Sequence, residues 1–234
     1  MSVSLQEVQA QLKQLLRPEQ FKDYCPNGLQ VQGKSQIDVI VSGVTASQAL
    51  IEKAILLKAD LLLVHHGYFW KGEDQAITGI KKRRVTALLE HQINLLAYHL
   101  PLDAHATLGN NAKLGELLGF TVTGDMGKQN NHPIGLLGTT DKAYSSAEFA
   151  QLLAQKLNRE PLVIEAGERP IKRVAWCTGA AQNYIQLAVD AGVDAYITGE
   201  ISEPTVHIAR ETGVHFFAAG HHATERYGVQ ALGE

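Results

Sequence analysis

The sequence predicts an α/β protein of two lobes, with mainly parallel sheets that are flanked by helices. Short apolar runs alternate with amphipathic stretches of helical period along the 234 residues, which is typical of parallel strands joined by crossover helices. The apolar runs are continuous, as expected for strands that are buried on both faces. A polar, turn-rich segment, Thr123–Pro133, lies near the middle of the chain. We therefore predict a first lobe over residues 1–125 and a second over residues 126–234.

Capping boxes mark two helix starts in the first lobe. Ser4 with Glu7, and Thr45 with Gln48, have the spacing at which the cap and the N3 side chain satisfy each other's amide groups. The elements predicted for this lobe, in chain order, are a helix over Ser4–Leu16, a strand over Ile37–Thr45, a helix over Ala46–Leu57, a strand over Asp60–His66, a helix over Ile80–His91, a strand over Ile93–His99 and a helix over Asn110–Leu118 that ends at Gly119.

The second lobe continues the alternation of strands and helices. Ser145 and Glu148 provide the first helix of this lobe with a capping box. The predicted elements are strands over Pro133–Thr140, Pro161–Gly167, Arg173–Gly179, Asp194–Glu200 and Val214–Gly220, and helices over Ala147–Leu157, Gln182–Ala191, Glu203–Glu211 and from about Ala223 onward.

Composition excludes several classes of protein. The chain has 45% hydrophobic and 19% charged residues and a net charge of −3. This charge balance does not favour binding to nucleic acid or to an anionic membrane. The basic run Lys81–Arg84 has no interleaved aromatic residues, which favours a solvated helix face over a nucleic-acid patch. The sequence shows no signal peptide, no run of membrane-spanning length and no CxxC pair between Cys25 and Cys177. These features predict a soluble, cytoplasmic protein.

Histidines and a carboxylate follow two neighbouring predicted strands of the first lobe. His65 and His66 end one apolar run, and His99 ends the next, with Asp103 shortly after it. Ligands of open parallel sheets bind outside the carboxyl ends of the strands, so these groups are candidates for one metal site. Each also has an ordinary explanation, as a solvated or packed histidine or as an aspartate that caps a turn.

A third strand end, in the second lobe, carries the same residue types. His221 and Glu225 are four residues apart on an expected helix, and His222 and Glu225, three apart, are also allowed by geometry. A glutamate in a first helical turn also needs no metal. Three such strand ends favour a shared site over coincidence. The nitrogen and oxygen donors outnumber the needs of one tetrahedral ion, so we predict two divalent ions (Zn, Mn, Fe or Ni) that activate a water.

Other residues are weaker candidates. Glu200 ends a predicted strand and could act as a general base or support the site, although an acid at a helix start explains it equally. His99 could shuttle protons. Thr178–Ala181 could hold a phosphate on backbone amides, although an ordinary strand–helix turn is the simpler interpretation. Tyr68–Trp70 could form the wall of a pocket or belong to the core. No GxSxG, Walker or GxGxxG motif supports serine chemistry or dinucleotide binding.

Five segments, in this order, resemble the GTP cyclohydrolase 1 type 2 homologues, also called the Nif-three-like family. They are PNGLQVQG, LLVHHGYFW, AYHLPLDAH, YITGEISEPTVH and GHHATER. The resemblance implies the two-lobed Nif-three-like fold, with a dinuclear metal site in the inter-lobe cleft. It implies that His99 lies near the metals, that Glu225 bridges them, and that His221 rather than His222 is a ligand. The metal roles that it carries over fall on His65, His66, Asp103, His221 and Glu225.

The resemblance also implies a homohexameric ring, assembled as a trimer of dimers. Our leading hypothesis is a metal-dependent hydrolase of GTP or a related small molecule or nucleotide, with Glu200 or His99 moving protons. The alternative is a non-enzymatic, ring-forming assembly protein with structural metals. A third hypothesis, nucleic acid threaded through a ring, rests only on Lys81–Arg84.

Overall fold

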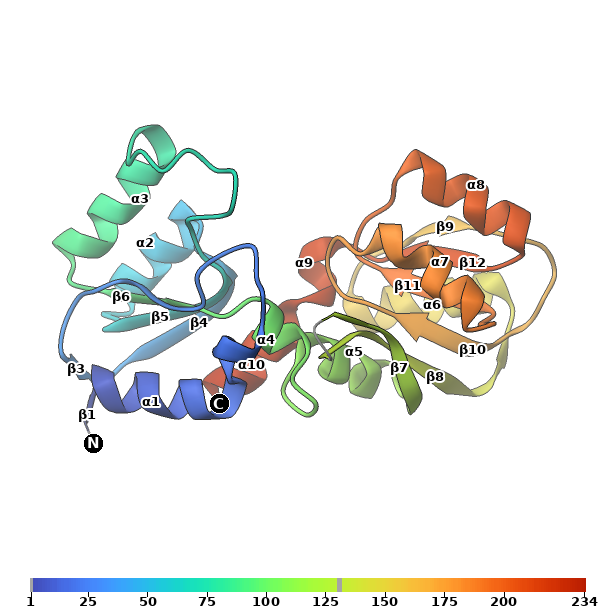
Figure 1. Ribbon diagram of the computed structural model, residues 1–234, viewed down its shortest axis with the longest axis horizontal. Helices are drawn as coiled ribbons and strands as arrows, with labels where there is room; N and C mark the ends of the chain where they lie inside the picture. The colour runs from blue at the N-terminus through green and yellow to red at the C-terminus, as the bar shows by residue number, and fades with distance from the viewer. Residues whose placement is uncertain (1, 130–131) are drawn as a thin grey trace. The chain divides into compact units, whose positions relative to one another are not determined.

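The computed structural model describes residues 2–129 and 132–234, and the chain divides into two compact units. Unit 1 consists of residues 1–102 and 229–234, and unit 2 of residues 103–228. Each contains a mixed sheet flanked by helices, so the α/β class and the division into two lobes are as predicted (Figure 1). No helix among the described residues is long and apolar enough to cross a bilayer.

The sheet of unit 1 is parallel in its centre and antiparallel at one edge. Its order is β2–β6–β5–β4, in which β6 pairs in parallel with β5, β5 pairs in parallel with β4, and β2 is antiparallel to β6. A short antiparallel pair, β1 with β3, lies apart from it. The strands are β1 Val3–Ser4, β2 Gly28–Val31, β3 Gln36–Ile37, β4 Ile40–Thr45, β5 Leu61–His66 and β6 Asn94–Ala97.

Strand β5 is apolar from Leu61 to Val64, as expected for a strand that helices cover on both faces. Leu62 and Val64 belong to the core cluster under α2 and α3, whereas Leu61 and Leu63 belong to the cluster that contains the buried face of α1 (Figure 1). Val229, near the end of the chain, joins the α1 cluster. The helices here are α1 Leu5–Leu16, η1 Pro18–Gln20, α2 Gln48–Leu56, α3 Gly79–Glu90 and α4 Leu100–Asp103, and α10 Arg226–Gly233 ends in this unit.

Unit 2 repeats this construction around a longer sheet of order β7–β8–β10–β11–β12–β9. Its centre, β10–β11–β12, is parallel, and its outer pairs are antiparallel. Val174 and Trp176 of β10 pack with α5 and α6, while Ala175 packs with α7 and α8. The elements are α5 Asn110–Leu118, β7 Thr121–Gln129, β8 His132–Tyr144, α6 Ser146–Leu157, β9 Leu162–Ile164, β10 Ile171–Trp176, η2 Gln182–Tyr184, α7 Ile185–Asp190, β11 Ala195–Thr198, α8 Glu203–Thr212, β12 His215–Ala218 and α9 His221–Thr224.

The structure corrects the predicted lobe boundary. Residues 125 and 126 lie within β7, which forms a hairpin with β8. The segment Thr123–Pro133 resembles a linker in sequence because an edge strand leaves most of its side chains in water. Its Met126, however, is 1% exposed. Asn130 and Asn131 of that segment lie outside the described residues. The division between the units falls instead after Leu102 and again after Gly228.

Local signals located most helix starts. The capping boxes at Ser4 and Ser145 are both present. The box predicted at Thr45 is wrong, because Thr45 is the last residue of β4 and Ser47 caps α2 by accepting from the amide of Leu50. The predicted strand over Ile37–Thr45 splits into β3 and β4.

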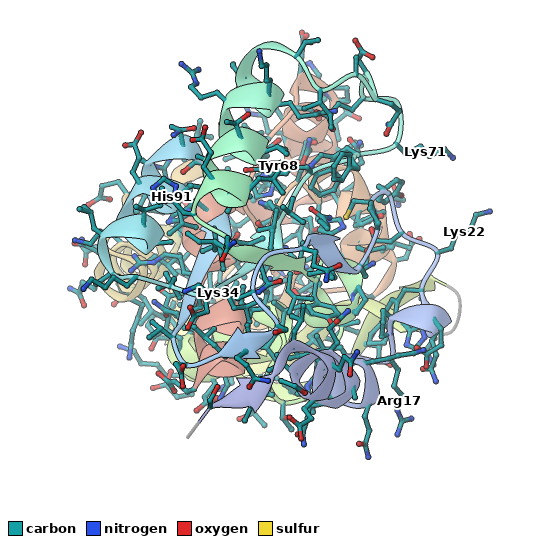
Figure 2. The ribbon with its side chains drawn as sticks, turned by 90° about the vertical axis from the view of Figure 1, so that its left-hand side faces the viewer. Arg17, Lys22, Lys34, Tyr68, Lys71 and His91 are labelled. Atoms are coloured by element: carbon teal, nitrogen blue, oxygen red, sulfur yellow. The ribbon has the colours of Figure 1, made fainter. Side chains whose placement is uncertain are left out.

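Tyr68 belongs to the core rather than to a pocket wall. Its side chain is 5% exposed, and its hydroxyl donates to the backbone oxygen of Ala46 at 2.7 Å. Burial raises the pKa of this phenol to about 12. Figure 2 shows Tyr68 within unit 1, while Lys22 and Lys71 project outward. Tyr68 therefore supports the turn after β5 without facing solvent.

Candidate metal centre

Unit 1 brings the imidazoles of His65, His66 and His99 together at the carboxyl ends of β5 and β6. The ring centroids of His65 and His66 are 4.4 Å apart, and that of His99 is 5.1 Å from His65 and 5.8 Å from His66. One ring nitrogen of each residue lies within 4.8 Å of the others. The parallel register of β5 and β6 produces this convergence, because it aligns the two strand ends.

Each of these rings is held through Nδ1 by an oxygen atom. Nδ1 of the fully buried His65 is 2.9 Å from the backbone oxygen of Tyr98, and Nδ1 of His66 is 3.2 Å from Oγ1 of Thr45. Nδ1 of His99 is 2.7 Å from Oδ1 of Asp23. An oxygen partner on one ring nitrogen orients a metal-binding histidine and fixes its tautomer. In all three residues, Nε2 is therefore the nitrogen that would coordinate an ion.

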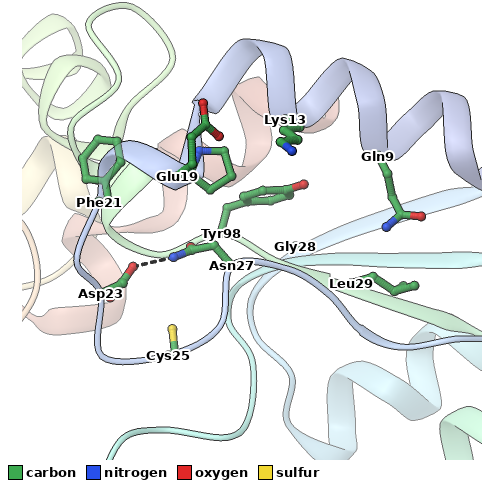
Figure 3. Close-up of a pocket in the computed structure, with 11 residues that line it drawn as sticks. Gln9, Lys13, Glu19, Phe21, Asp23, Cys25, Asn27, Gly28, Leu29 and Tyr98 are labelled. Carbon is green, nitrogen blue, oxygen red and sulfur yellow. Dashed lines mark hydrogen bonds between the residues drawn. The ribbon is translucent and has the colours of Figure 1, made fainter.

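Asp23 was not predicted from the sequence, yet it organises the surroundings of His99. Its carboxylate accepts from Nδ2 of Asn27 at 2.8 Å (Figure 3). It also accepts from the amide of Leu100 at 2.9 Å. Asn27 in turn accepts from the amide of His99 at 2.8 Å. Burial raises the pKa of Asp23, but the hydrogen bonds and charge of His99, with Asn27 and Tyr24, outweigh burial and place it below its ordinary value. In the sequence, Asp23 is followed only by the turn-forming residues Pro26–Gly28, which do not indicate a role for it.

Trp70 closes one side of this cluster. Its ring lies edge-on to His99 and His66, with centroid distances of 5.0 and 5.8 Å, and its Nε1 donates to the backbone oxygen of Gly67 at 3.3 Å. Of the three residues Tyr68–Trp70, Trp70 is the one that borders the candidate site.

Unit 2 gathers its candidate ligands where β10, β11 and β12 end. Two glycines give α9 room to approach the neighbouring strand ends. A Cβ on Gly179, whose φ is +73°, would lie 2.1 Å from Oε1 of Glu225, and a Cβ on Gly199 would lie 2.6 Å from Cα of His221. Only residues without side chains allow Glu225 and His221 to occupy these positions.

His221 lies between two carboxylates. Its Nδ1 is 2.7 Å from Oε1 of Glu200, and its Nε2 is 3.1 Å from Oε2 of the buried Glu225. The hydrogen bond with Glu225, against the effect of burial and with help from Glu200, raises the pKa of His221 to about 9. His222 is exposed. Of the two histidine–glutamate pairs that spacing allowed, the structure forms the one with His221.

Asp103 belongs to a polar network of the same unit. Its Oδ1 accepts from Nδ2 of Asn110 at 2.8 Å and from Oγ1 of Thr178 at 3.4 Å, and Asn111 donates to its backbone oxygen at 3.3 Å. Burial, together with the negative charges of Asp103 and Glu225, raises the pKa of the Cys177 thiol well above its usual value. The carboxylates of Asp103 and Glu225 therefore both influence the Cys177 thiol, which follows the end of β10.

The turn at Thr178–Ala181 does not form the phosphate cradle considered from the sequence. The amide of Thr178 donates to Oδ1 of Asn111, that of Gly179 to Oγ1 of Thr224, and that of Ala181 to Oγ1 of Thr198. Internal partners occupy these amides, so the ordinary strand–helix turn is the correct interpretation.

The donors in both units fit divalent metal ions. Unit 1 offers imidazole nitrogens with oriented rings, and unit 2 offers carboxylates with one imidazole, which are ordinary ligands of Zn²⁺ and of other borderline ions. His221 follows the pattern of unit 1, because an oxygen of Glu200 holds its Nδ1.

Comparison with known proteins identifies the family. The family model described as Duf34/NIF3 (NGG1p interacting factor 3) matches residues 3–234. The chain belongs to the Duf34/NIF3 family. Over 234 residues this NIF3 chain is 55% identical to a Pseudomonas aeruginosa protein named GTP cyclohydrolase 1 type 2 homolog, covering 100% of the chain and 92% of the relative.

Two solved structures share the fold over nearly the full length. The structure described as protein ybgI, of unknown function, has a TM-score of 0.94 and 49% identity, with 98% of the NIF3 chain and 92% of that chain covered. The protein TTHA1606 from Thermus thermophilus has a TM-score of 0.87 and 33% identity, with 98% and 91% covered.

Proposed function

We propose that this NIF3 chain binds two divalent metal ions and hydrolyses a small molecule with them. The observation that carries the proposal is the oxygen partner on Nδ1 of His65, His66, His99 and His221. An oxygen partner alone does not mark a ligand, since Nδ1 of the exposed His91 is also 2.9 Å from the backbone oxygen of Ala87. In His65, His66 and His99 the oxygen partner accompanies ring nitrogens that lie within 4.8 Å of one another, which is the arrangement of metal ligands. The name of the curated relatives directs the first substrate test to GTP.

The proposed ligands are His65 and His66 from unit 1 and Asp103, His221 and Glu225 from unit 2. Glu225 is the candidate bridging ligand, since a carboxylate has two oxygens to share. In the metal-free protein, His221 gives Glu225 a positive partner, which a divalent ion would replace. Zn²⁺, Mn²⁺ and Fe²⁺ are the first ions to test, because all accept imidazole and carboxylate ligands.

His99 and Glu200 take different roles in this proposal. Divalent ions supply Lewis acidity and lower the pKa of water. Nδ1–H of His99 donates to Asp23. Its other ring nitrogen, Nε2, is the kind of atom that can accept a proton from a reacting molecule. Glu200 contacts Nδ1 of His221, so we assign it the positioning of that ring rather than proton transfer.

Assembly as a homohexameric ring in the cytoplasm is part of the proposal. Apolar side chains on α2, α3 and the turns beside them support self-association, because Leu56 is 76% exposed and Ile80 59% exposed. A non-enzymatic assembly with structural metals shares this feature. Light scattering before and after chelation separates the two, since structural metals predict that the assembly dissociates when the ions are removed.

Metal content per chain, measured by elemental mass spectrometry on protein purified without chelators, tests the proposal. We expect about two ions per chain. His221→Ala should lower this number, whereas the adjacent exposed His222→Ala should not. His66→Ala and the exposed His91→Ala form the matched pair for unit 1. Folded protein that takes up no ion on reconstitution would refute the metal centre.

Turnover of GTP by the reconstituted protein tests the hydrolase part. The expected result is a ring-opened or hydrolysed product, from GTP or from its phosphate-free nucleoside guanosine, that disappears in His66→Ala and persists in His91→Ala. Metal-loaded protein without turnover of GTP or of uncharged heterocycles would leave structural metals as the better account.

A further inference from the structure

A cavity of about 660 Å³ lies within unit 2, beside Asp103. It is lined by residues 104–107, by α5 and by the hairpin β7–β8. Its volume is typical of pockets that hold a small organic molecule. Phe120, Val122 and Leu136 give it an apolar wall, which suits a flat ring system.

The charges around this cavity disfavour a polyphosphate. Apart from the proposed metal ligand Asp103, whose charge an ion would offset, Glu116 and Asp125 contribute two carboxylates to the lining, against the single ammonium group of Lys113. That ammonium group is already 2.8 Å from Oε2 of Glu116. Sites for nucleoside triphosphates use cationic side chains or backbone amides around the phosphates. The lining offers no surplus of positive charge for them.

The polar groups of the lining suit an uncharged molecule that both donates and accepts hydrogen bonds. Nδ1 of His105 accepts from the amides of Thr107 and Leu108 at 3.3 and 3.1 Å, so the donor of this ring is Nε2. The side chain of Asp125 is 43% exposed; its Oδ2 is 3.9 Å from Nζ of Lys128, and its carboxylate has further acceptor positions. A nitrogen heterocycle whose edge carries amide-like groups could accept from Nε2 of His105 and donate to Asp125, while its ring packs against the apolar wall.

We propose that this cavity binds an uncharged nitrogen heterocycle that carries no phosphate, and that such heterocycles are the substrate class of the chain. The substrate part rests on the hydrolase proposed above, whereas the binding part does not. Asp103 links the two, because it is both a proposed metal ligand and part of the cavity lining. A heterocycle held there lies in the same cavity as the group that would bind an ion.

Titration calorimetry on metal-free protein with guanosine, guanosine monophosphate and GTP tests the binding. These probes share one heterocycle and differ only in phosphate number. We expect guanosine to bind about tenfold more tightly than GTP, with the monophosphate between them. Equal or tighter binding of GTP, or no binding of guanosine at millimolar concentration, would overturn the proposal. Because no metal is present, failure of the metal centre leaves this test intact.

Val122→Arg tests the location of binding. Val122 is 52% exposed, so an arginine can be accommodated by the fold while it fills the cavity. Guanosine binding should be lost in this variant and retained in Thr121→Arg, which changes an exposed neighbour outside the lining. Lys113→Met should leave guanosine affinity within about twofold, since guanosine carries no phosphate for the ammonium group to bind. If Val122→Arg changed the native mass and left guanosine binding intact, the face would be a contact between copies and the proposal would fail.

Discussion

The two units hold their candidate metal ligands in opposite ways. Unit 1 collects imidazoles, which are neutral when deprotonated and are positioned by oxygen atoms. Unit 2 collects carboxylates around one imidazole, and a proton on His221 balances part of their charge. Burying unbalanced carboxylates is costly, whereas burying hydrogen-bonded imidazoles is not. Unit 2 should therefore depend far more on protonation and on metal than unit 1.

The largest effect is expected from Gly179→Ala in unit 2. The new Cβ would lie 2.1 Å from Oε1 of Glu225 at a φ of +73°. The strained backbone and the displaced carboxylate should together cost roughly 3 kcal/mol of unfolding free energy and weaken metal binding. Gly119→Ala, also at positive φ (+74°) but with open space around the new Cβ, should cost only about 1 kcal/mol.

Urea unfolding of both glycine variants measures this difference. Equal losses of stability would mean that the contact with Glu225 adds no cost. Gly179 would then not be needed for the position of Glu225.

The next effect concerns the anchor of His99 in unit 1. Asp23→Ala removes the acceptor of His99 Nδ1, of Asn27 Nδ2 and of the amide of Leu100. Leaving buried donors without that acceptor should cost about 2 kcal/mol. Asp23→Asn keeps an acceptor oxygen and should recover about half of the loss. Urea titration provides the measurement, and an alanine variant as stable as the parent would show that the network does not hold the ring.

The pH dependence of the metal-free protein should differ between the units. The folded-state pKa of His221, about 9, lies above its ordinary value of 6.5, so its contribution is complete below pH 6.5 and is lost as pH rises through 9. After discounting for a side chain that is 36% exposed, the loss should be about 1 kcal/mol. The pKa of Asp23 is lowered, so its contribution is lost only as pH falls below its ordinary value of 3.8.

Fluorescence can report on each unit separately, because the two tryptophans lie in different units. In Trp70→Phe, the emission of Trp176 should show unit 2 weakening between pH 6.5 and 9, and His221→Ala should abolish the trend. A slope that persists in His221→Ala would assign the dependence to another group.

The smallest effect on stability is expected from Glu200→Gln. Its side chain is 45% exposed, so unfolding should change by less than about 0.5 kcal/mol. Metal affinity should nevertheless fall about tenfold, because His221 loses the carboxylate that orients its Nδ1. Competition with a coloured chelator measures the affinity, and the exposed Glu203→Gln is the control. An unchanged affinity would contradict the positioning role.

Predictability differed between elements for physical reasons. Helices with capping side chains, such as α1 and α6, were located from sequence because the cap and its partners are local. Strand β5 was recognisable because both faces are buried. Strand β7 was missed, since an edge strand with exposed Thr121, Val122 and Thr123 has the polarity of a linker. That error moved the predicted lobe boundary into a hairpin.

The sequence by itself determined which side chains stand at the strand ends, because His65, His66, His99 and His221 follow apolar runs directly. Only the tertiary structure decided how each ring is held. Asp23 is 76 residues from His99 in sequence, and Gly179 meets Glu225 across a different strand end. Strand register and close backbone approach create these contacts, and neither leaves a periodic signal in the chain. Chemistry of the donors is thus a local property, and their orientation is a global one.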